Sequence, residues 1–228
     1  MRDFLMRHGL WAVRALCTLE FAFGLLLLRA YLKKKRVILL LMACMSFGLF
    51  YDALVLSVGN HLGHSALHGF SRLRFVFHGM LLPLMLPICA EALDLPKPAK
   101  RAVGVLTAVL MAAGAVCGFR TDLEETEIAG IMRCFSSEAT PAFAEKFLMM
   151  LSSGGAAALL LSGLAVWIRK KNPLLFIGAL LMFVFEALGP ATGNTDLIFL
   201  IGMFGECSLA LFYYLYSGTV DPETLQGE

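Results

Sequence analysis

Charged residues are scarce in this chain of 228 residues: Asp, Glu, Lys and Arg make up 16% of it. Apolar residues make up 59%, and the mean hydropathy is +0.77. A soluble domain usually carries about a quarter charged residues and under half apolar ones. The composition therefore excludes an ordinary soluble domain. The net charge of +2 comes from short basic runs between apolar blocks, so nothing indicates a nucleic-acid partner.

The sequence also lacks the local motifs of soluble enzymes. It contains no H-E-x-x-H or C-x-x-C pattern, no G-x-S-x-G turn and no phosphate-binding loop. Soluble hydrolases and nucleotide-binding proteins therefore have no support from motifs. Internal repeats and low-complexity segments are absent as well.

Long apolar blocks are what the sequence does have, each near the length of roughly 20 residues that crosses a bilayer as a helix. The first block is too long for a signal peptide, no small-x-small cleavage site follows it, and "KKKR" at 33–36 closes it like a stop-transfer signal. We predict an all-α, seven-helix transmembrane bundle forming one domain over 1–228. The expected spans are 10–32, 37–59, 72–93, 101–119, 142–168, 173–192 and 196–217.

Positive charge predicts the direction of the chain. The connections after the first, third and fifth spans hold 11 of the 19 Lys and Arg residues, in three short stretches. The positive-inside rule places these stretches in the cytoplasm. We therefore expect a cell-membrane protein with its N-terminus outside, its C-terminus in the cytoplasm and an external acidic loop at 120–141.

Cysteines bracket this predicted external loop. Cys117 and Cys134 lie on the same face, and an external compartment permits a disulfide between them without requiring it. The remaining four cysteines fall inside predicted spans, where we expect them to pack as small apolar residues.

Ionisable residues inside the spans are the main functional signal. Each costs about 2.5–3.5 kcal/mol near a helix centre, so such residues normally face the bundle interior. Glycines three to seven residues away support an inward orientation, because small residues mark close helix contacts. The set, drawn from five predicted spans in the middle and outer half of the membrane, is Glu20, Asp52, Arg74, His78, Glu186 and Glu206.

These residues allow a structural and a chemical interpretation. The acids could pair with Arg74 or Arg14 and simply hold the bundle together. However, four carboxylates face one firm cation, Arg74, and His78 if it is protonated. Uncompensated acids in a low-dielectric site either hold protons or attract a cation. We therefore assign acid–base roles to the four acids and His78, and expect Arg72 to extend to the lipid headgroups.

Residues near the expected outer mouth complete the candidate site. We predict that Arg74, Tyr51, Asn60 and Asn194 bind substrate. A nearby histidine row, "NHLGHSALH", places His61, His64 and His68 at helical spacings of three and four, which would suit a metal. Gly63 makes a helix there doubtful, and solvated histidines at the membrane interface are the favoured interpretation.

One stretch resembles a family of uncharacterised seven-helix bacterial membrane proteins. It runs from "YDALVLSVGNHLG" through "SRLRFVFHGMLLPLMLP" and covers under a fifth of the chain. The resemblance implies a bacterial inner-membrane setting and brings no assigned activity. The matching positions are Tyr51, Asp52, Gly59, Gly63, Arg74, Phe75, His78 and Pro83.

The sequence leaves two functions in competition. The first is a membrane-embedded enzyme that acts on a lipid or an isoprenoid by carboxylate acid–base chemistry. The second is a transporter coupled to protons or cations. A one-sided cluster without repeated halves favours the enzyme slightly, because carriers commonly show inverted repeats. A sensory or structural seven-helix protein is a third alternative. Cofactor and oligomeric state are left open.

Overall fold

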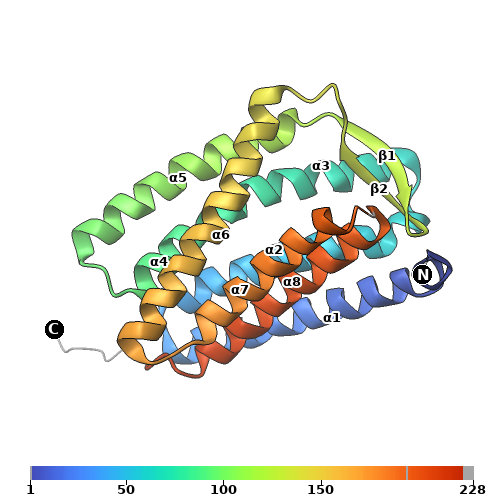
Figure 1. The fold of residues 1–228 in the computed structure, drawn as a ribbon. Coiled ribbons are helices and arrows are strands. Elements are labelled where there is room, and N and C mark those ends of the chain that lie inside the picture. Colours follow the sequence, from blue (N-terminus) through green and yellow to red (C-terminus); the bar gives the residue numbers. More distant parts are fainter. Residues whose placement is uncertain (1, 194, 223–228) are drawn as a thin grey trace.

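The computed structural model describes residues 2–193 and 195–222, with side chains over 8–188, 193 and 200–222. Helices build nearly all of this part (Figure 1), which confirms the all-α class. The α-helices are α1 (Arg2–Lys34), α2 (Val37–Val58), α3 (His64–Leu81), α4 (Met85–Ala92), α5 (Lys97–Arg120), α6 (Ala142–Lys170), α7 (Leu174–Thr192) and α8 (Thr195–Ser217). Two 3₁₀ turns, η1 (Gly59–His61) and η2 (Leu82–Leu84), and two strands, β1 (Leu123–Ile128) and β2 (Ile131–Ser136), complete the fold.

Within the described residues, six helical segments are long and apolar enough to cross a membrane. A further apolar helix covers Leu174–Leu188 over its described residues and is shorter. Large apolar side chains also point away from the core: Val105 and Leu161, for example, are each 67% exposed. Exposed apolar area of this extent is typical of a surface covered by lipid. The chain is therefore a multi-pass membrane protein, and the count of seven spans stays a prediction.

The third predicted span is a composite of helices. A continuous segment predicted at 72–93 begins earlier, at His64, and η2 interrupts it between α3 and α4. Pro83 lies inside η2. Proline has no backbone N–H and clashes with the preceding turn, so it breaks the helical ladder at this point. The segment still covers 29 residues, His64–Ala92.

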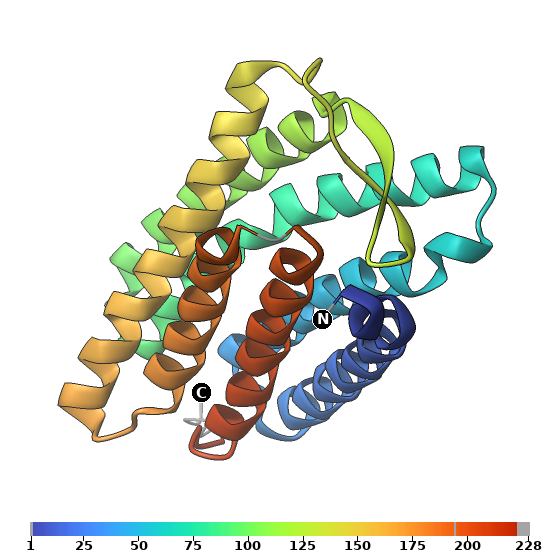
Figure 2. The ribbon, with the colours of Figure 1, turned by 45° about the vertical axis from the view of Figure 1, so that its right-hand side comes forward.

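The connection predicted as a loop at 120–141 instead forms a β-hairpin. β1 and β2 pair antiparallel, with Glu125 opposite Cys134. Ala129 and Gly130 both have positive φ, 52° and 77°, as a two-residue hairpin turn of the mirror-image type requires. The hairpin lies against α2, α3 and η1, and Figure 2 shows it crossing α3 toward the start of α1.

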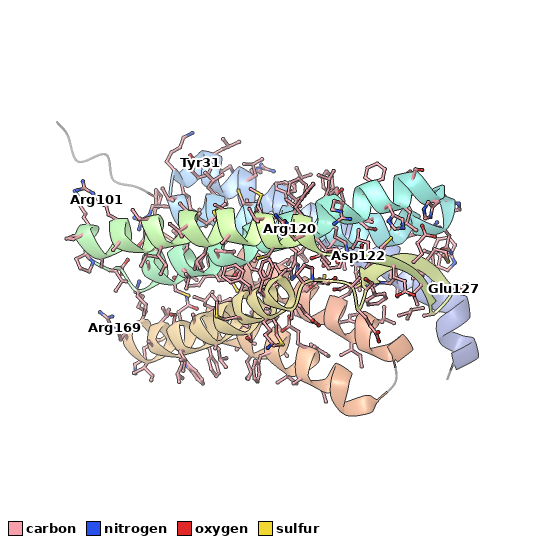
Figure 3. The ribbon with its side chains drawn as sticks, turned by 90° about the horizontal axis from the view of Figure 1, so that it is seen from above. Tyr31, Arg101, Arg120, Asp122, Glu127 and Arg169 are labelled. Carbon is pink, nitrogen blue, oxygen red and sulfur yellow. The ribbon has the colours of Figure 1, made fainter. Side chains whose placement is uncertain are left out.

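The bundle has two chemically different ends. Figure 3 places Arg101 and Arg169 at one end, which we call the basic end, and Glu127 toward the opposite end, which we call the hairpin end. A tightly packed core fills the half nearer the basic end. Its members with 0% exposure include Leu39, Met42, Ile88, Leu159 and Tyr213, from α2, α4, α6 and α8.

Two glycines bring α3 and α5 into backbone contact. A Cβ atom on Gly79 would overlap the carbonyl oxygen of Gly114, and a Cβ atom on Gly114 would overlap that of Gly79. Small residues allow such close helix crossings in membranes. This contact fixes the position of α3 along α5, and therefore the position of the ionisable residues that α3 carries.

We predict that Gly114→Ala lowers the thermal midpoint of the detergent-solubilised protein by several degrees. The added methyl group must push the two backbones apart, and overpacking of this kind costs about 1–3 kcal/mol. Gly104→Ala is the matched control, because Gly104 lies on the same helix with nothing within 4 Å of the added Cβ. Equal midpoints for the two variants would show that the crossing does not support the fold.

Candidate functional site

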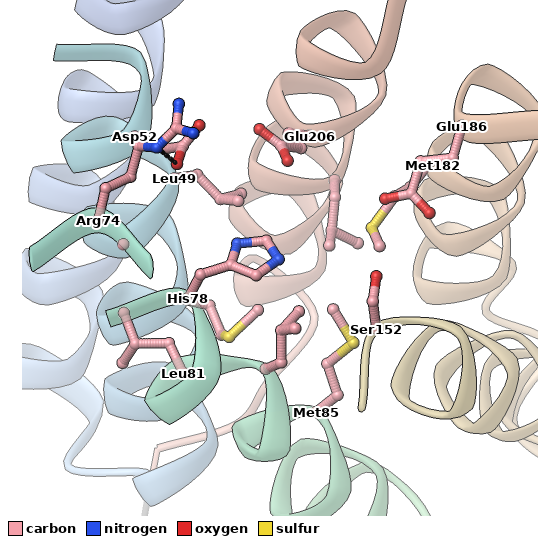
Figure 4. A pocket seen from close by; sticks show the side chains of 14 residues that line it. Leu49, Asp52, Arg74, His78, Leu81, Met85, Ser152, Met182, Glu186 and Glu206 are labelled. Carbon is pink, nitrogen blue, oxygen red and sulfur yellow. Dashed lines mark ion pairs between the residues drawn. The ribbon is translucent and has the colours of Figure 1, made fainter. Parts of the chain in front are cut away.

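A hollow between the helices gathers five of the predicted ionisable residues. We call it the inner chamber, and the space between its lining atoms, including space open to solvent, is about 510 Å³. Figure 4 shows side chains from both sides of the bundle pointing into it. Its polar members are Asp52, Arg74, His78, Ser152, Glu186 and Glu206, and its apolar members are Met45, Leu49, Leu81, Leu82, Met85, Met182 and Leu209, with Gly48.

A second hollow joins the inner chamber at its polar side. This vestibule holds about 860 Å³, including space open to solvent. Four residues line both hollows, namely Asp52, Arg74, His78 and Glu206. The vestibule alone adds Leu56, Phe75, Arg133, Phe135, Ser136, Gly202 and Met203. The two spaces therefore form one pocket that is charged and wide toward the hairpin and mainly apolar toward the core.

Arg74 connects three elements at the junction of the two hollows. Its Nε lies 3.4 Å from Oδ1 of Asp52 on α2, which confirms that α3 brings this arginine to an acid of a neighbouring helix. Its Nη2 donates a hydrogen bond of 3.1 Å to the carbonyl of Cys134 on β2. A buried charge needs such partners, because removing one leaves an uncompensated ion in a low-dielectric site.

His78 and Glu206 complete the junction from opposite sides. His78 lies one helical turn after Arg74, so both side chains share a face of α3. Glu206 on α8 faces the Asp52–Arg74 pair across the hollow, with the His78 ring beside both (Figure 4). Glu186 on α7 lines the far wall, near Ser152 of α6. An imidazole and carboxylates around one space can donate and accept protons from a bound molecule.

The sequence interpretation missed Arg133, which β2 carries into the vestibule. Its guanidinium stacks 4.0 Å from the centroid of the Phe135 ring. Burial, together with the positive charge of Arg74, lowers the pKa of Arg133 to about 9, while Asp52 acts in the opposite direction. The site thus has two arginines rather than one. The run of apolar and polar residues at 131–136 could have indicated a strand there, and so a way to place Arg133 over the pocket.

Ser152 was also missed, and the sequence gave no signal for it. A serine within an apolar helix usually bonds the backbone of its own helix, so its type alone does not indicate a pocket. Its place in the inner chamber follows from the packing of α6 against α4.

Glu20 lies outside both hollows. It is fully buried on α1, and neither carboxylate oxygen has a hydrogen-bond partner among the residues that the structure describes. Asp52 is close enough to interact with it electrostatically. Glu20 therefore lies near Asp52 but does not line the space where a substrate would lie.

Two residues predicted to bind substrate hold the scaffold instead. Asn60 donates a 2.7 Å hydrogen bond to the carbonyl of Gly130 and accepts one of 2.6 Å from the N–H of Met132, so its amide is committed to the hairpin turn. The Tyr51 hydroxyl donates to the carbonyl of Phe70, and its ring meets Phe77 edge to face. The third such residue, Asn194, lies outside the described residues.

Other expectations are corrected at the hairpin end. Arg72, which was expected to extend to the lipid headgroups, bonds to the protein: its Nη1 donates to the carbonyls of Phe119 and Thr121, which the end of α5 leaves without helical partners. Cys117 and Cys134, considered for a disulfide, are both buried free thiols.

The histidine row divides between two partners, both outside the pocket. Nε2 of His61 lies 3.1 Å from a guanidinium nitrogen of Arg14, which places the Arg14 side chain at the histidine row. His64 and His68 instead contact Glu125 on β1.

We predict that Asn60→Ala loosens the hairpin without unfolding the bundle. Losing two net hydrogen bonds of about 1 kcal/mol each should speed amide hydrogen exchange over 129–133 by roughly 5- to 30-fold. Asn172→Ala is the control, since Asn172 makes two similar bonds at the basic end, to Thr219 and Leu174. Faster exchange in the hairpin of the control variant, or none in Asn60→Ala, would contradict the assigned role.

No family model and no curated protein sequence matches the chain. The resemblance of the Tyr51–Pro83 stretch to uncharacterised seven-helix proteins therefore stays a prediction. Function has to be argued from the geometry of the pocket.

Proposed function

We propose that this protein is a membrane-embedded enzyme that acts on an amphiphile with an anionic head, such as a lipid or an isoprenoid. The observation that carries the proposal is the lining of the pocket: a vestibule with two arginines opens into a chamber whose deeper part is mainly apolar, and acid–base groups lie between them.

The vestibule suits an anionic headgroup. Arg74 and Arg133 both line it. Guanidinium groups present several donors in a planar fork that matches phosphate and carboxylate oxygens. The Phe135 ring stacks against the guanidinium of Arg133. This contact limits the rotamers of Arg133 and therefore the directions in which its N–H groups point.

The inner chamber suits an aliphatic tail. Met45, Met85 and Met182 contribute flexible, polarizable side chains to its wall, and methionine adapts to irregular apolar shapes. These side chains line the chamber closely, so a tail would enter by displacing them, which the rotatable bonds of methionine allow. The tail would lie beyond His78, deeper in the bundle.

The reacting bond would then lie at the junction, beside His78 and Glu206. One of these groups would give a proton to the leaving oxygen, and the other would take a proton from the attacking nucleophile. Asp52 is held by Arg74 and serves to orient that arginine rather than to transfer protons. Arg74 and Arg133 would stabilise negative charge that develops on the head.

A pocket closed at one end favours an enzyme over a carrier. Leu39, Met42 and Tyr213, each with 0% exposure, pack between the inner chamber and the basic end. A hollow at the basic end, lined by Arg36, Glu91 and others, shares no lining residue with the pocket. In the seven-span topology predicted from the basic runs, the pocket opens on the side of the cell membrane away from the cytoplasm.

Coupled transport of protons or cations is the second candidate. The buried carboxyl group of Glu20, without a hydrogen-bond partner among the described residues, favours it. Such a group can carry a proton toward Asp52. This candidate requires Glu20→Gln to abolish acid-driven flux in proteoliposomes, whereas the enzyme proposal expects no flux to begin with.

We predict that Glu206→Gln and Asp52→Asn each abolish the lipid change that the protein causes in cells. Lipid extracts of cells with and without the protein, compared by mass spectrometry, should differ in at least one anionic amphiphile. Glu145→Gln is the matched control, because Glu145 is exposed at the start of α6 and should leave the change intact. Identical extracts from all cells would exclude the enzyme.

We also predict that Arg133→Gln reduces the amount of anionic amphiphile that purifies with the protein by at least tenfold. The loss of one charged hydrogen-bonding partner costs about 1.5–3 kcal/mol, which corresponds to roughly 10- to 150-fold in affinity. Arg120→Gln is the control, since Arg120 is exposed at the same end. Native mass spectrometry measures the bound species, and equal occupancy in both variants would remove Arg133 from the site.

A further inference from the structure

A cluster of two histidines and one glutamate lies outside the pocket, where the hairpin meets the start of α3. His64 is the first residue of α3 and His68 lies one turn later, so both rings project from the same face of the helix. Glu125 reaches them from β1. Nδ1 of His64 lies 2.8 Å from Oε1 of Glu125, and Nε2 of His68 lies 3.4 Å from the same oxygen.

We propose that His64, His68 and Glu125 form a binding site for a divalent transition-metal ion, with zinc as the representative ion. One ligand atom from each residue lies within 4.8 Å of the other two. A tetrahedral zinc ion with bonds of 2.0–2.1 Å needs ligand atoms about 3.3 Å apart. The distances of 2.8 Å and 3.4 Å bracket this value, so small rotamer changes place all three atoms around one ion.

The carboxylate oxygen at the centre of the cluster supports a metal over a simple ion pair. Oε1 of Glu125 is buried and makes no hydrogen bond within the described part of the chain. It therefore lies close to two imidazole nitrogens without the direction of a hydrogen bond to either. A cation between the three atoms would satisfy this oxygen and both nitrogens at once.

The ligand types define the class of ion. Two imidazoles and one carboxylate suit zinc, nickel or copper, whereas calcium and magnesium prefer oxygen ligands throughout. His64 is exposed and faces solvent, which leaves a fourth position for water. His61 is not a ligand, because its ring contacts Arg14 on another helix.

A metal at this place would hold β1 against α3. Glu125 pairs with Cys134 across the hairpin, and the Cys134 carbonyl accepts the hydrogen bond of Arg74. The ion would therefore fix the strand that carries Arg133 and that partners Arg74. The metal ion would therefore position the hairpin, and this role does not depend on which molecule the pocket binds.

The test uses the full chain purified in detergent through a tag without histidines. Zinc chloride is titrated calorimetrically after treatment with a chelator, and hydrogen exchange is followed over 123–128. We expect one zinc ion per chain and slower exchange in β1 when zinc is present. At a hundredfold excess over the dissociation constant, the thermal midpoint should rise by roughly 5–10 °C.

Variants separate this site from unspecific binding. His64→Ala with His68→Ala, and separately Glu125→Gln, should weaken zinc binding by at least roughly a hundredfold and abolish the protection of β1. His61→Ala should bind zinc as the unmodified chain does, and magnesium should produce neither effect. Retained affinity in the double variant, an equal loss in His61→Ala, or zinc binding without protection of β1 would overturn the proposal.

Discussion

The buried charge of Arg74 is the constraint on which the rest of the structure depends. A guanidinium in the interior of a membrane protein is stable only when its partners are in place. Asp52 supplies a carboxylate from α2, and the Cys134 carbonyl supplies an acceptor from β2. The same side chain therefore fixes the spacing of α2 and α3 and holds the hairpin over the end of the bundle.

This constraint also creates the polarity of the pocket. Arg74 lies where the vestibule meets the inner chamber, so charge is concentrated at that junction and decreases toward Met85 and the core. The hairpin adds Arg133 on the vestibule side. The result is a space with a charged end, which includes both arginines, and a mainly apolar end, and the proposed amphiphile would span the two. Binding of the head in the vestibule and of the tail in the inner chamber would place the bond between head and tail beside His78 and Glu206.

Much of the bundle could be predicted because lipid imposes simple rules on sequence. The predicted span 142–168 corresponds to α6 (Ala142–Lys170), since an apolar run, a preceding proline and a following basic run define a helix that crosses lipid. The ion pair between Arg74 and an acid of another helix could be predicted because isolated charges are too costly in a bilayer. Pro83 lies within the predicted span 72–93, but the interruption of the helix at this proline was not predicted.

The hairpin, and the contacts made by residues in and around it, could not be predicted. Its acidic first strand resembles a solvated loop, and only the tertiary contact of Asn60 with the turn reveals why the backbone is ordered there. Without the hairpin, Arg133 could not be placed in the site and Asn60 was interpreted as a ligand of the substrate. Arg72 was misjudged for the same reason, because the unpaired carbonyls at the end of α5 are not visible in the sequence.

The central claim is that one pocket holds both the head and the tail of an amphiphile. A cryo-EM structure of the protein purified in its native lipids tests this most directly. The account predicts elongated density with its head within about 3 Å of the Arg74 and Arg133 guanidinium groups and its tail among Met45, Met85 and Met182. A bare cation among the carboxylates, with all lipid density confined to the outer surface of the bundle, would contradict it.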